Sequence, residues 1–167
     1  VTADSSYRES DAPGTDTIAR ISTAWENAVD AWAPCCRVVK LRTPVVLAEE
    51  GGALPKLAMP VRLGAGAAFG NGEQWMPWVH IDDLCAAYMR AMDDSSMSGA
   101  YNVAADSATN ASFTRSVARI LKRKLWLPAV PGWLLHVALG EMACLLLEGS
   151  AVDGSRLRDS GFVYRLD

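Results

Sequence analysis

Histidine and cysteine are scarce in this chain, and they are not arranged as metal ligands. Its 167 residues include two histidines and four cysteines, and no two cysteines have the Cys-x-x-Cys spacing. A zinc site needs several such ligands at short spacings, so no metal centre is predicted. Cys35 and Cys36 are adjacent, which would strain a disulfide between them, and unpaired thiols fit a reducing compartment.

Long uninterrupted apolar runs are also missing. The stretch that most resembles a membrane span, residues 125–147, contains two prolines and two glycines. A membrane-spanning helix needs roughly 20 largely uninterrupted apolar residues, so this stretch is interpreted as a buried helix. The chain begins with Val1 rather than Met and shows no signal peptide, and we therefore expect a processed or partial chain.

The chain also lacks a large excess of positive or negative charge. The 16 Lys and Arg residues and 19 Asp and Glu residues give a formal net charge of −3. This overall balance predicts neither a nucleic-acid partner nor an anionic membrane. Residues 112–167 are mildly basic, with 8 basic and 5 acidic groups, and we interpret the cations at 115–123 as the solvated face of a helix.

The residues that are present indicate an α/β fold. With 50% hydrophobic residues, the chain is long enough to bury a core. Apolar residues spaced three and four apart after Asp16, a helix-capping residue, predict a helix that buries one face and ends before Pro34. Short β-branched runs at 38–41 and 45–47 predict strands of a parallel sheet, because helices and strands alternate.

The middle of the chain continues this alternation. Residues 51–72 are rich in glycine and predict a long connection. Residues 75–81 predict a strand, followed by a helix that Asp82 caps and that extends to about Met92. That helix is apolar around most of its circumference, so we expect other elements to cover more than one face. A strand at 100–103 and a helix from Asn110 follow.

Several short motifs occur together and in a fixed order. They are residues 42–47 (RTPVVL), 51–54 (GGAL), 70–76 (GNGEQWM), 78–84 (WVHIDDL), 109–113 (TNASF) and 146–149 (LLEG). On these motifs the chain resembles the C-terminal half of the epimerase family, atypical extended short-chain dehydrogenase/reductases with plastid and mitochondrial members.

The resemblance implies a fold, a cofactor and a partner. It implies the later part of a Rossmann-like parallel sheet, at residues 1–50 and 79–108. A small, mostly helical substrate-side subdomain would comprise residues 51–78 and 109–167. The implied cofactor is NAD or NADP, with most contacts made by an N-terminal half that carries the glycine-rich phosphate turn. That half, or partner chains of a larger complex, would complete the fold, and a chloroplast or mitochondrion is favoured over the cytoplasm.

The resemblance also implies site residues. Arg42, Thr43 and Val45 follow a predicted strand where the family's chain passes the nicotinamide, although Arg42 could instead pair with an acidic neighbour. Gln74 and Trp75 belong to the segment that faces a nucleotide sugar in related epimerases, although a tryptophan there is often core.

His80 is the remaining candidate on the substrate side. It could carry a proton, because histidine titrates near neutrality. The alternative is a structural histidine, with Asp82 or Asp83 capping the following helix. Met76 and Pro77 stand where related epimerases have Arg-Asp, so a uridine contact is not supported at these two positions.

The Tyr-x-x-x-Lys pair of most short-chain dehydrogenases is absent. Ile18 and Ser22 occupy the corresponding positions, and neither can perform that proton transfer. Two functions therefore stay open. One is an epimerase-like NAD(P)-dependent oxidoreductase or epimerase acting on a nucleotide-sugar-type substrate. The other is a non-catalytic scaffold or accessory subunit that retains the fold.

Overall fold

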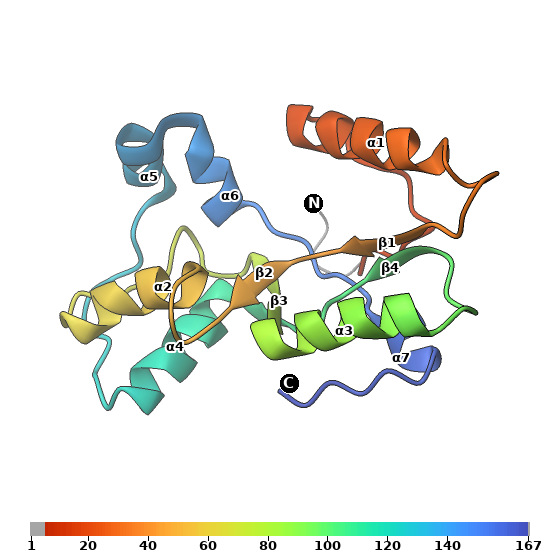
Figure 1. The fold of residues 1–167 in the computed structure, drawn as a ribbon. Coiled ribbons are helices and arrows are strands. Elements are labelled where there is room, and N and C mark those ends of the chain that lie inside the picture. The colour runs from red at the N-terminus through yellow and green to blue at the C-terminus, as the bar shows by residue number, and fades with distance from the viewer. Residues whose placement is uncertain (1–5, 167) are drawn as a thin grey trace.

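Helices and strands alternate along the chain, as the sequence predicts (Figure 1). The computed structural model describes the backbone of residues 6–166 and their side chains, except those of residues 138, 139, 141, 142 and 145. The elements in chain order are α1 Thr17–Asp30, β1 Val39–Arg42, β2 Val45–Leu47, α2 Ala53–Arg62, β3 Trp75–His80, α3 Ile81–Asp93, β4 Gly99–Asn102, β5 Asp106–Thr109, α4 Asn110–Ile120, α5 Gly132–Leu139, a 3-10 turn η1 Gly140–Ala143, α6 Cys144–Leu147 and α7 Ser155–Asp159.

The strands form two small sheets. β1 and β4 are parallel, and Arg42 lies beside Asn102 at their carboxyl ends. In the second sheet β3 lies between β2, which is parallel to it, and β5, which is antiparallel. Within residues 6–166, β1 pairs with β4 on one side and has an unpaired edge on the other. Parallel sheets are normally larger and covered on both faces, so this edge can accept a further strand.

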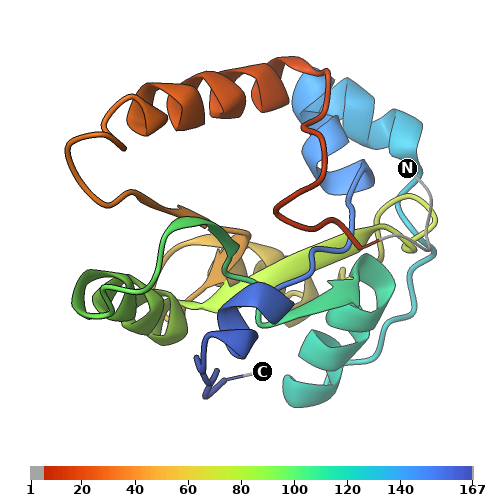
Figure 2. The same cartoon turned by 90° about the vertical axis from the view of Figure 1, so that its right-hand side faces the viewer.

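Helices lie on both sides of the β1–β4 sheet. α1 lies over one face, while α3 and α7 lie on the opposite side (Figure 2). The main core gathers side chains from β3, α3, α7, β4 with the residues that flank it, and the segment that follows α7. Among its most buried members are Val79, Met97, Val103 and Leu157. A second cluster joins α2 to α4 through Ala58, Val61, Val117 and Ala118. The α/β fold with a parallel sheet is thus confirmed.

α1 confirms the predicted helix but not its predicted burial. The Asp16 carboxylate accepts a hydrogen bond from Ala19 N at 2.9 Å, so it caps the helix as expected. The apolar stripe is exposed, however, and Trp25 is 71% accessible. The prediction that α1 buries a face is wrong for this chain, because burial requires a partner surface that residues 6–166 do not provide.

α3 is present as predicted, with two corrections. Its N-cap is His80, whose Nδ1 accepts from Asp82 N at 3.2 Å, so Asp82 is not the capping residue. Tyr88 and Met92 are 51% and 71% exposed, so the expected cover over more than one face is absent from residues 6–166. Asp83 is buried and has another role, since it binds the backbone of the C-terminal segment.

Two stretches differ from the sequence-based expectation. Residues 51–72 are not a continuous connection, because α2 occupies Ala53–Arg62. Residues 125–147 are not one buried helix but the short segments α5, η1 and α6. Among the helices that the structure describes, none combines the length and apolar character needed to cross a bilayer.

Candidate functional site

A hollow of about 910 Å³ lies between α1 and β1. Trp25 and Val29 of α1 form part of one wall, and the whole of β1 forms another. The hollow extends to Thr43 and Asn102, which lie at the carboxyl ends of the two parallel strands. Ligands of open α/β sheets bind beyond these strand ends, so the hollow is the candidate binding site.

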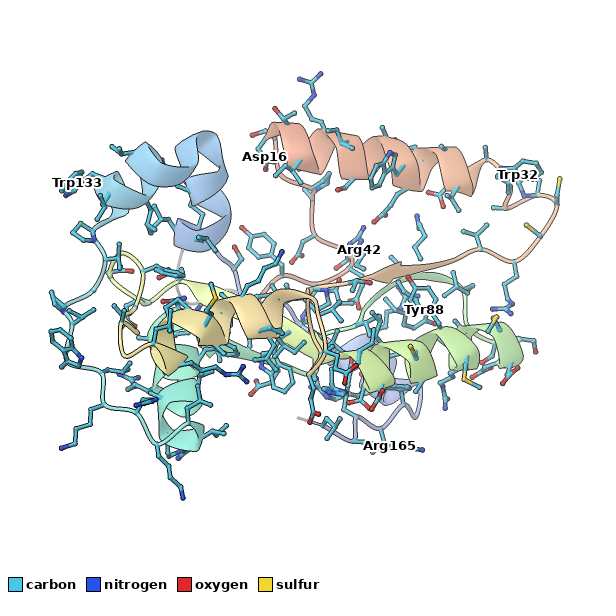
Figure 3. The ribbon with its side chains drawn as sticks, turned by 60° about the vertical axis from the view of Figure 1, so that its left-hand side comes forward. Asp16, Trp32, Arg42, Tyr88, Trp133 and Arg165 are labelled. Atoms are coloured by element: carbon cyan, nitrogen blue, oxygen red, sulfur yellow. The ribbon has the colours of Figure 1, made fainter. Side chains whose placement is uncertain are left out.

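Arg42 is fixed at the edge of this hollow (Figure 3). Its Nε and Nη2 donate to the two carboxylate oxygens of Glu26 at 2.6 and 2.9 Å, and its Nη1 donates to Glu9 O at 3.1 Å. Arg42 therefore has the acidic neighbour that one of the two interpretations predicted. The bidentate hydrogen bond from Arg42 holds the pKa of Glu26 below its usual value, and the same bond raises the pKa of Arg42.

Lys40 extends the ion-pair network toward the end of α1. Its Nζ lies 2.9 Å from both carboxylate oxygens of Asp30 and 3.5 Å from Glu26. The hydrogen bond to Asp30 is the largest cause of a raised Lys40 pKa. Charged pairs thus tie α1 to β1 across the hollow.

The N-terminal segment crosses the carboxyl end of β4. Glu9 Oε1 accepts from Asn102 N at 2.7 Å, and Asn102 Nδ2 donates to the backbone oxygens of Tyr7 and Asp153 at 3.3 and 3.0 Å. Tyr7 also exchanges backbone hydrogen bonds with the 151–153 segment. The buried amide of Asn102 therefore joins the N-terminal segment and the 151–153 segment at the hollow.

Thr43 and Val45 lie just beyond β1. Thr43 is exposed at the hollow, and its Oγ1 donates to Leu41 O at 3.3 Å. Val45 is half-buried and lies beside Trp78 in the parallel pairing of β2 with β3. The structure thus brings Arg42 and Thr43 to the hollow, while Val45 starts the neighbouring sheet.

Gln74 links three segments of the chain. Its Nε2 donates to Phe69 O at 3.1 Å and to Leu146 O at 2.7 Å, while its Oε1 is buried without a hydrogen-bond partner among the described residues. Gly149 passes so close to Trp75 that a Cβ on this glycine would collide with the Trp75 backbone oxygen. The 146–149 motif therefore packs on the start of β3.

His80 is separated from Gln74 and Trp75. It ends β3, and its ring lies 3.6 Å from the exposed carboxylate of Asp82. Trp75 begins the same strand, so the two residues lie roughly 16 Å apart and on opposite faces. The three predicted substrate-side residues consequently do not form one cluster, and their contact with a substrate stays a prediction.

Three residues of the site were not singled out from the sequence: Glu9, Glu26 and Asn102. Asn102 carried a signal, because a polar residue inside an apolar strand must find hydrogen bonds when buried. Glu26 lies 16 residues before Arg42, and this pairing depends on how α1 lies over β1. No three His, Cys, Asp or Glu side chains within the described part of the chain gather to hold a metal ion.

Comparison with known proteins shows the family. Residues 19–104 match the NAD dependent epimerase/dehydratase family, and residues 130–167 match a domain of unknown function, DUF1731. The human epimerase family protein SDR39U1 is 35% identical over 160 residues, which cover 93% of this chain and 54% of the relative. Its chloroplastic homologue in Arabidopsis thaliana is 32% identical over 160 residues, 95% of this chain and 46% of the relative.

Solved structures agree with the sequence matches. The human SDR39U1 structure with NADPH has a TM-score of 0.88 and 34% identity, and the match covers 99% of this chain and 57% of that one. A nucleoside-diphosphate sugar epimerase from Corynebacterium glutamicum has a TM-score of 0.78 and 28% identity, covering 98% of this chain and 31% of that one. The chain spans about half the length of the curated relatives it matches. It belongs to the NAD dependent epimerase/dehydratase family.

Proposed function

We propose that the chain is the C-terminal part of an NAD(P)-dependent oxidoreductase or epimerase that acts on a nucleotide-sugar-type substrate. The observation that carries this proposal is the hollow of about 910 Å³ that opens at the carboxyl ends of two parallel strands. Family membership, and the NADPH in the human SDR39U1 structure, support a nicotinamide dinucleotide as its ligand.

The residues at the hollow fit the nicotinamide end of such a cofactor. Thr43 presents an exposed hydroxyl whose oxygen can accept a hydrogen bond, while a contact of Val45 with the cofactor would have to be made from the start of β2, outside the hollow. Arg42 would act as a positioning residue, because Glu26 and Glu9 already fix its guanidinium. When bound, the dinucleotide would supply the hydride that is exchanged with the substrate.

A further part of the fold would complete this site. The chain has about half the length of its curated relatives, and β1 has an unpaired edge in the described structure. We propose that an N-terminal half, in the same polypeptide or a partner chain, adds strands to this edge and supplies the phosphate-binding turn. Such strands would also close the hollow from water.

The substrate side would be formed around β3. We propose that Gln74 and Trp75 recognise the substrate at the beginning of β3. There Gln74 Oε1 has no hydrogen-bond partner among the described residues, and Trp75 lines a second hollow of about 260 Å³. His80 would act from the opposite end of the strand. Its Nδ1 would contact a substrate group in place of the Asp82 amide that it accepts from in the structure.

A non-catalytic accessory subunit is the second candidate. It is favoured by the identity of Ile18 and Ser22 on α1, because these residues cannot replace a tyrosine and a lysine in proton transfer. Either candidate is compatible with an organelle, and the chloroplastic Arabidopsis relative supports this location. Import of the tagged protein into isolated chloroplasts or mitochondria would test the location.

Dinucleotide binding and turnover distinguish the candidates. The protein, expressed with its whole natural coding sequence, is titrated with NADPH and NADH and then assayed with nucleotide sugars at the nicotinamide absorbance. The enzyme proposal predicts binding that Thr43→Ala weakens about tenfold through one lost hydrogen bond, while the exposed control Thr15→Ala leaves it unchanged. Failure to bind either dinucleotide overturns the enzyme proposal and leaves the accessory subunit, and binding without any turnover also favours the accessory subunit.

A further inference from the structure

α5 is an apolar helix on the molecular surface. Its sequence GWLLHVAL has one ionisable residue, His136, which is exposed. Trp133 and Val137 are 68% and 77% accessible, and Trp133 points away from the rest of the molecule (Figure 3). Helices that are apolar on all sides are normally buried in protein or lipid, so α5 requires a partner surface.

The chain that leads into α5 is strongly basic. Residues 107–140 contain no Asp or Glu but contain five cations, all of them exposed: Arg115, Arg119, Lys122, Arg123 and Lys124. None of these cations forms an ion pair with a carboxylate of the described residues. Arg115 and Arg119 lie four residues apart on one side of α4, and Lys122, Arg123 and Lys124 follow the end of this helix. The overall charge of −3 therefore conceals a local cationic surface.

Lys122 occupies a backbone conformation that favours glycine. Its φ is 52°, and among the described residues no other residue except glycine has a positive φ. Arg123 N donates to Ala118 O at 2.8 Å and Lys122 N donates to Arg119 O at 3.1 Å, the bonding pattern of a Schellman helix end. Glycine at this position would avoid the strain, so the lysine charge is present despite a cost in stability.

The cations and the exposed aromatic residues lie along one end of the molecule. The chain passes from the end of α4 through Trp126, which is 73% exposed, to α5. This end is opposite the β1–β4 sheet, whose free edge can take further strands (Figure 1). A further strand that pairs with the free edge of β1 would therefore lie away from the cationic residues of α4 and would leave them exposed.

We propose that residues 115–137, the basic-aromatic segment, form a binding surface for an anionic lipid bilayer. Tryptophan and aliphatic side chains enter the interfacial layer of a membrane, while lysine and arginine interact with anionic headgroups. Charge complementarity between these cations and anionic headgroups thus identifies an anionic bilayer as the partner. The all-apolar α5 favours lipid over nucleic acid, because Trp133 and Val137 match the apolar layer of a membrane better than phosphates or base edges. α5 would lie in the plane of the interface and not span it.

Vesicle sedimentation tests this surface. The protein, expressed with its whole natural coding sequence, is mixed with phosphatidylcholine vesicles that contain or lack phosphatidylglycerol. Binding is expected with phosphatidylglycerol and should weaken in high salt. The variant R123Q/K124Q should lose about thirtyfold in partitioning, since each base near an anionic surface contributes about fivefold. The control R20Q/R165Q removes the same charge at two exposed arginines elsewhere and should bind normally.

Two further variants separate charge from apolar insertion and from folding. Lys122→Gly should bind about fivefold more weakly while it raises the unfolding temperature, so a loss of binding cannot come from misfolding. Trp133→Ser should reduce binding, whereas Trp32→Ser, which changes an exposed tryptophan after α1, should not. Equal binding to both kinds of vesicle overturns the proposal. So does binding to a single-stranded oligonucleotide that Trp133→Ser leaves unchanged while vesicle binding is absent.

Discussion

Asp83 is expected to hold the C-terminal segment on α3. Its carboxylate is buried and accepts from Arg165 N at 3.1 and 3.2 Å and from Leu166 N at 3.0 Å. Asp83→Asn keeps the size of the side chain but replaces one acceptor oxygen by an amide that cannot accept. The remaining oxygen can still accept at the Oδ2 position, but the new amide nitrogen then lies 3.1 Å from Arg165 N and both backbone amides lose a charged acceptor. A hydrogen bond to a charged group is worth roughly 1.5–3 kcal/mol. We expect the free energy of unfolding to fall by about 2–3 kcal/mol.

Urea denaturation of matched variants measures this loss. The control is Asp82→Asn on the same turn of α3, where the carboxylate is 78% exposed and the expected change is within about 0.5 kcal/mol. Hydrogen exchange of the Leu166 amide adds a local readout, because its protection should fall in Asp83→Asn. Equal stability of the two variants, with unchanged exchange at Leu166, would show that Asp83 does not hold the C-terminal segment.

Three further predictions concern pH and association. The pKa of Glu26 is lowered, chiefly by Arg42, so its stabilisation is complete above the usual value near 4.5 and is lost as the pH falls; Glu26→Gln should show a flatter acid unfolding curve. Burial raises the pKa of Tyr164 to about 12, so the folded state keeps this proton longer than the unfolded chain and loses stability between about pH 10 and 12; Tyr164→Phe should lose less over that range. Residues 1–167 expressed alone should associate through the exposed stripe of α1 and the free edge of β1; a monomer with cooperative melting, measured by light scattering and calorimetry, would contradict this.

Local sequence patterns predicted those elements that local forces determine. α1, α3 and α4 follow from apolar spacing, and the Asp16 cap is confirmed. β3 follows from its aromatic and β-branched residues. In each case the periodicity or the capping chemistry lies within a few residues of the element that it determines.

Elements that depend on distant partners were not predicted. β5 has the polar sequence DSAT and exists because it pairs with β3. α2 contains Pro55 and Pro60 after two glycines, a pattern typical of a connection. Pro55 lies in the first helical turn, where its missing N–H has no intrahelical partner to lose, and α2 packs on α4. Tertiary contacts therefore outweighed the local signals.

In the candidate site, too, local sequence predicted some features and missed those that depend on distant partners. The alternatives for Arg42 were a cofactor contact and an acidic partner, and the sequence could name the second without locating Glu26. The contacts of Glu9 with Arg42 and Asn102 join segments that are 33 and 93 residues apart in sequence. Such contacts follow from the way α1 and the N-terminal segment cross the strand ends, which periodicity does not encode.

If this chain forms the C-terminal part of a dinucleotide-binding site, the whole protein must bind a nicotinamide dinucleotide. The most direct test is a calorimetric titration of the protein, expressed with its whole natural coding sequence, with NADPH and with NADH. We expect saturable binding of at least one dinucleotide, weakened about tenfold by Thr43→Ala and unaffected by Thr15→Ala. Absence of binding to both dinucleotides by the folded protein would contradict it.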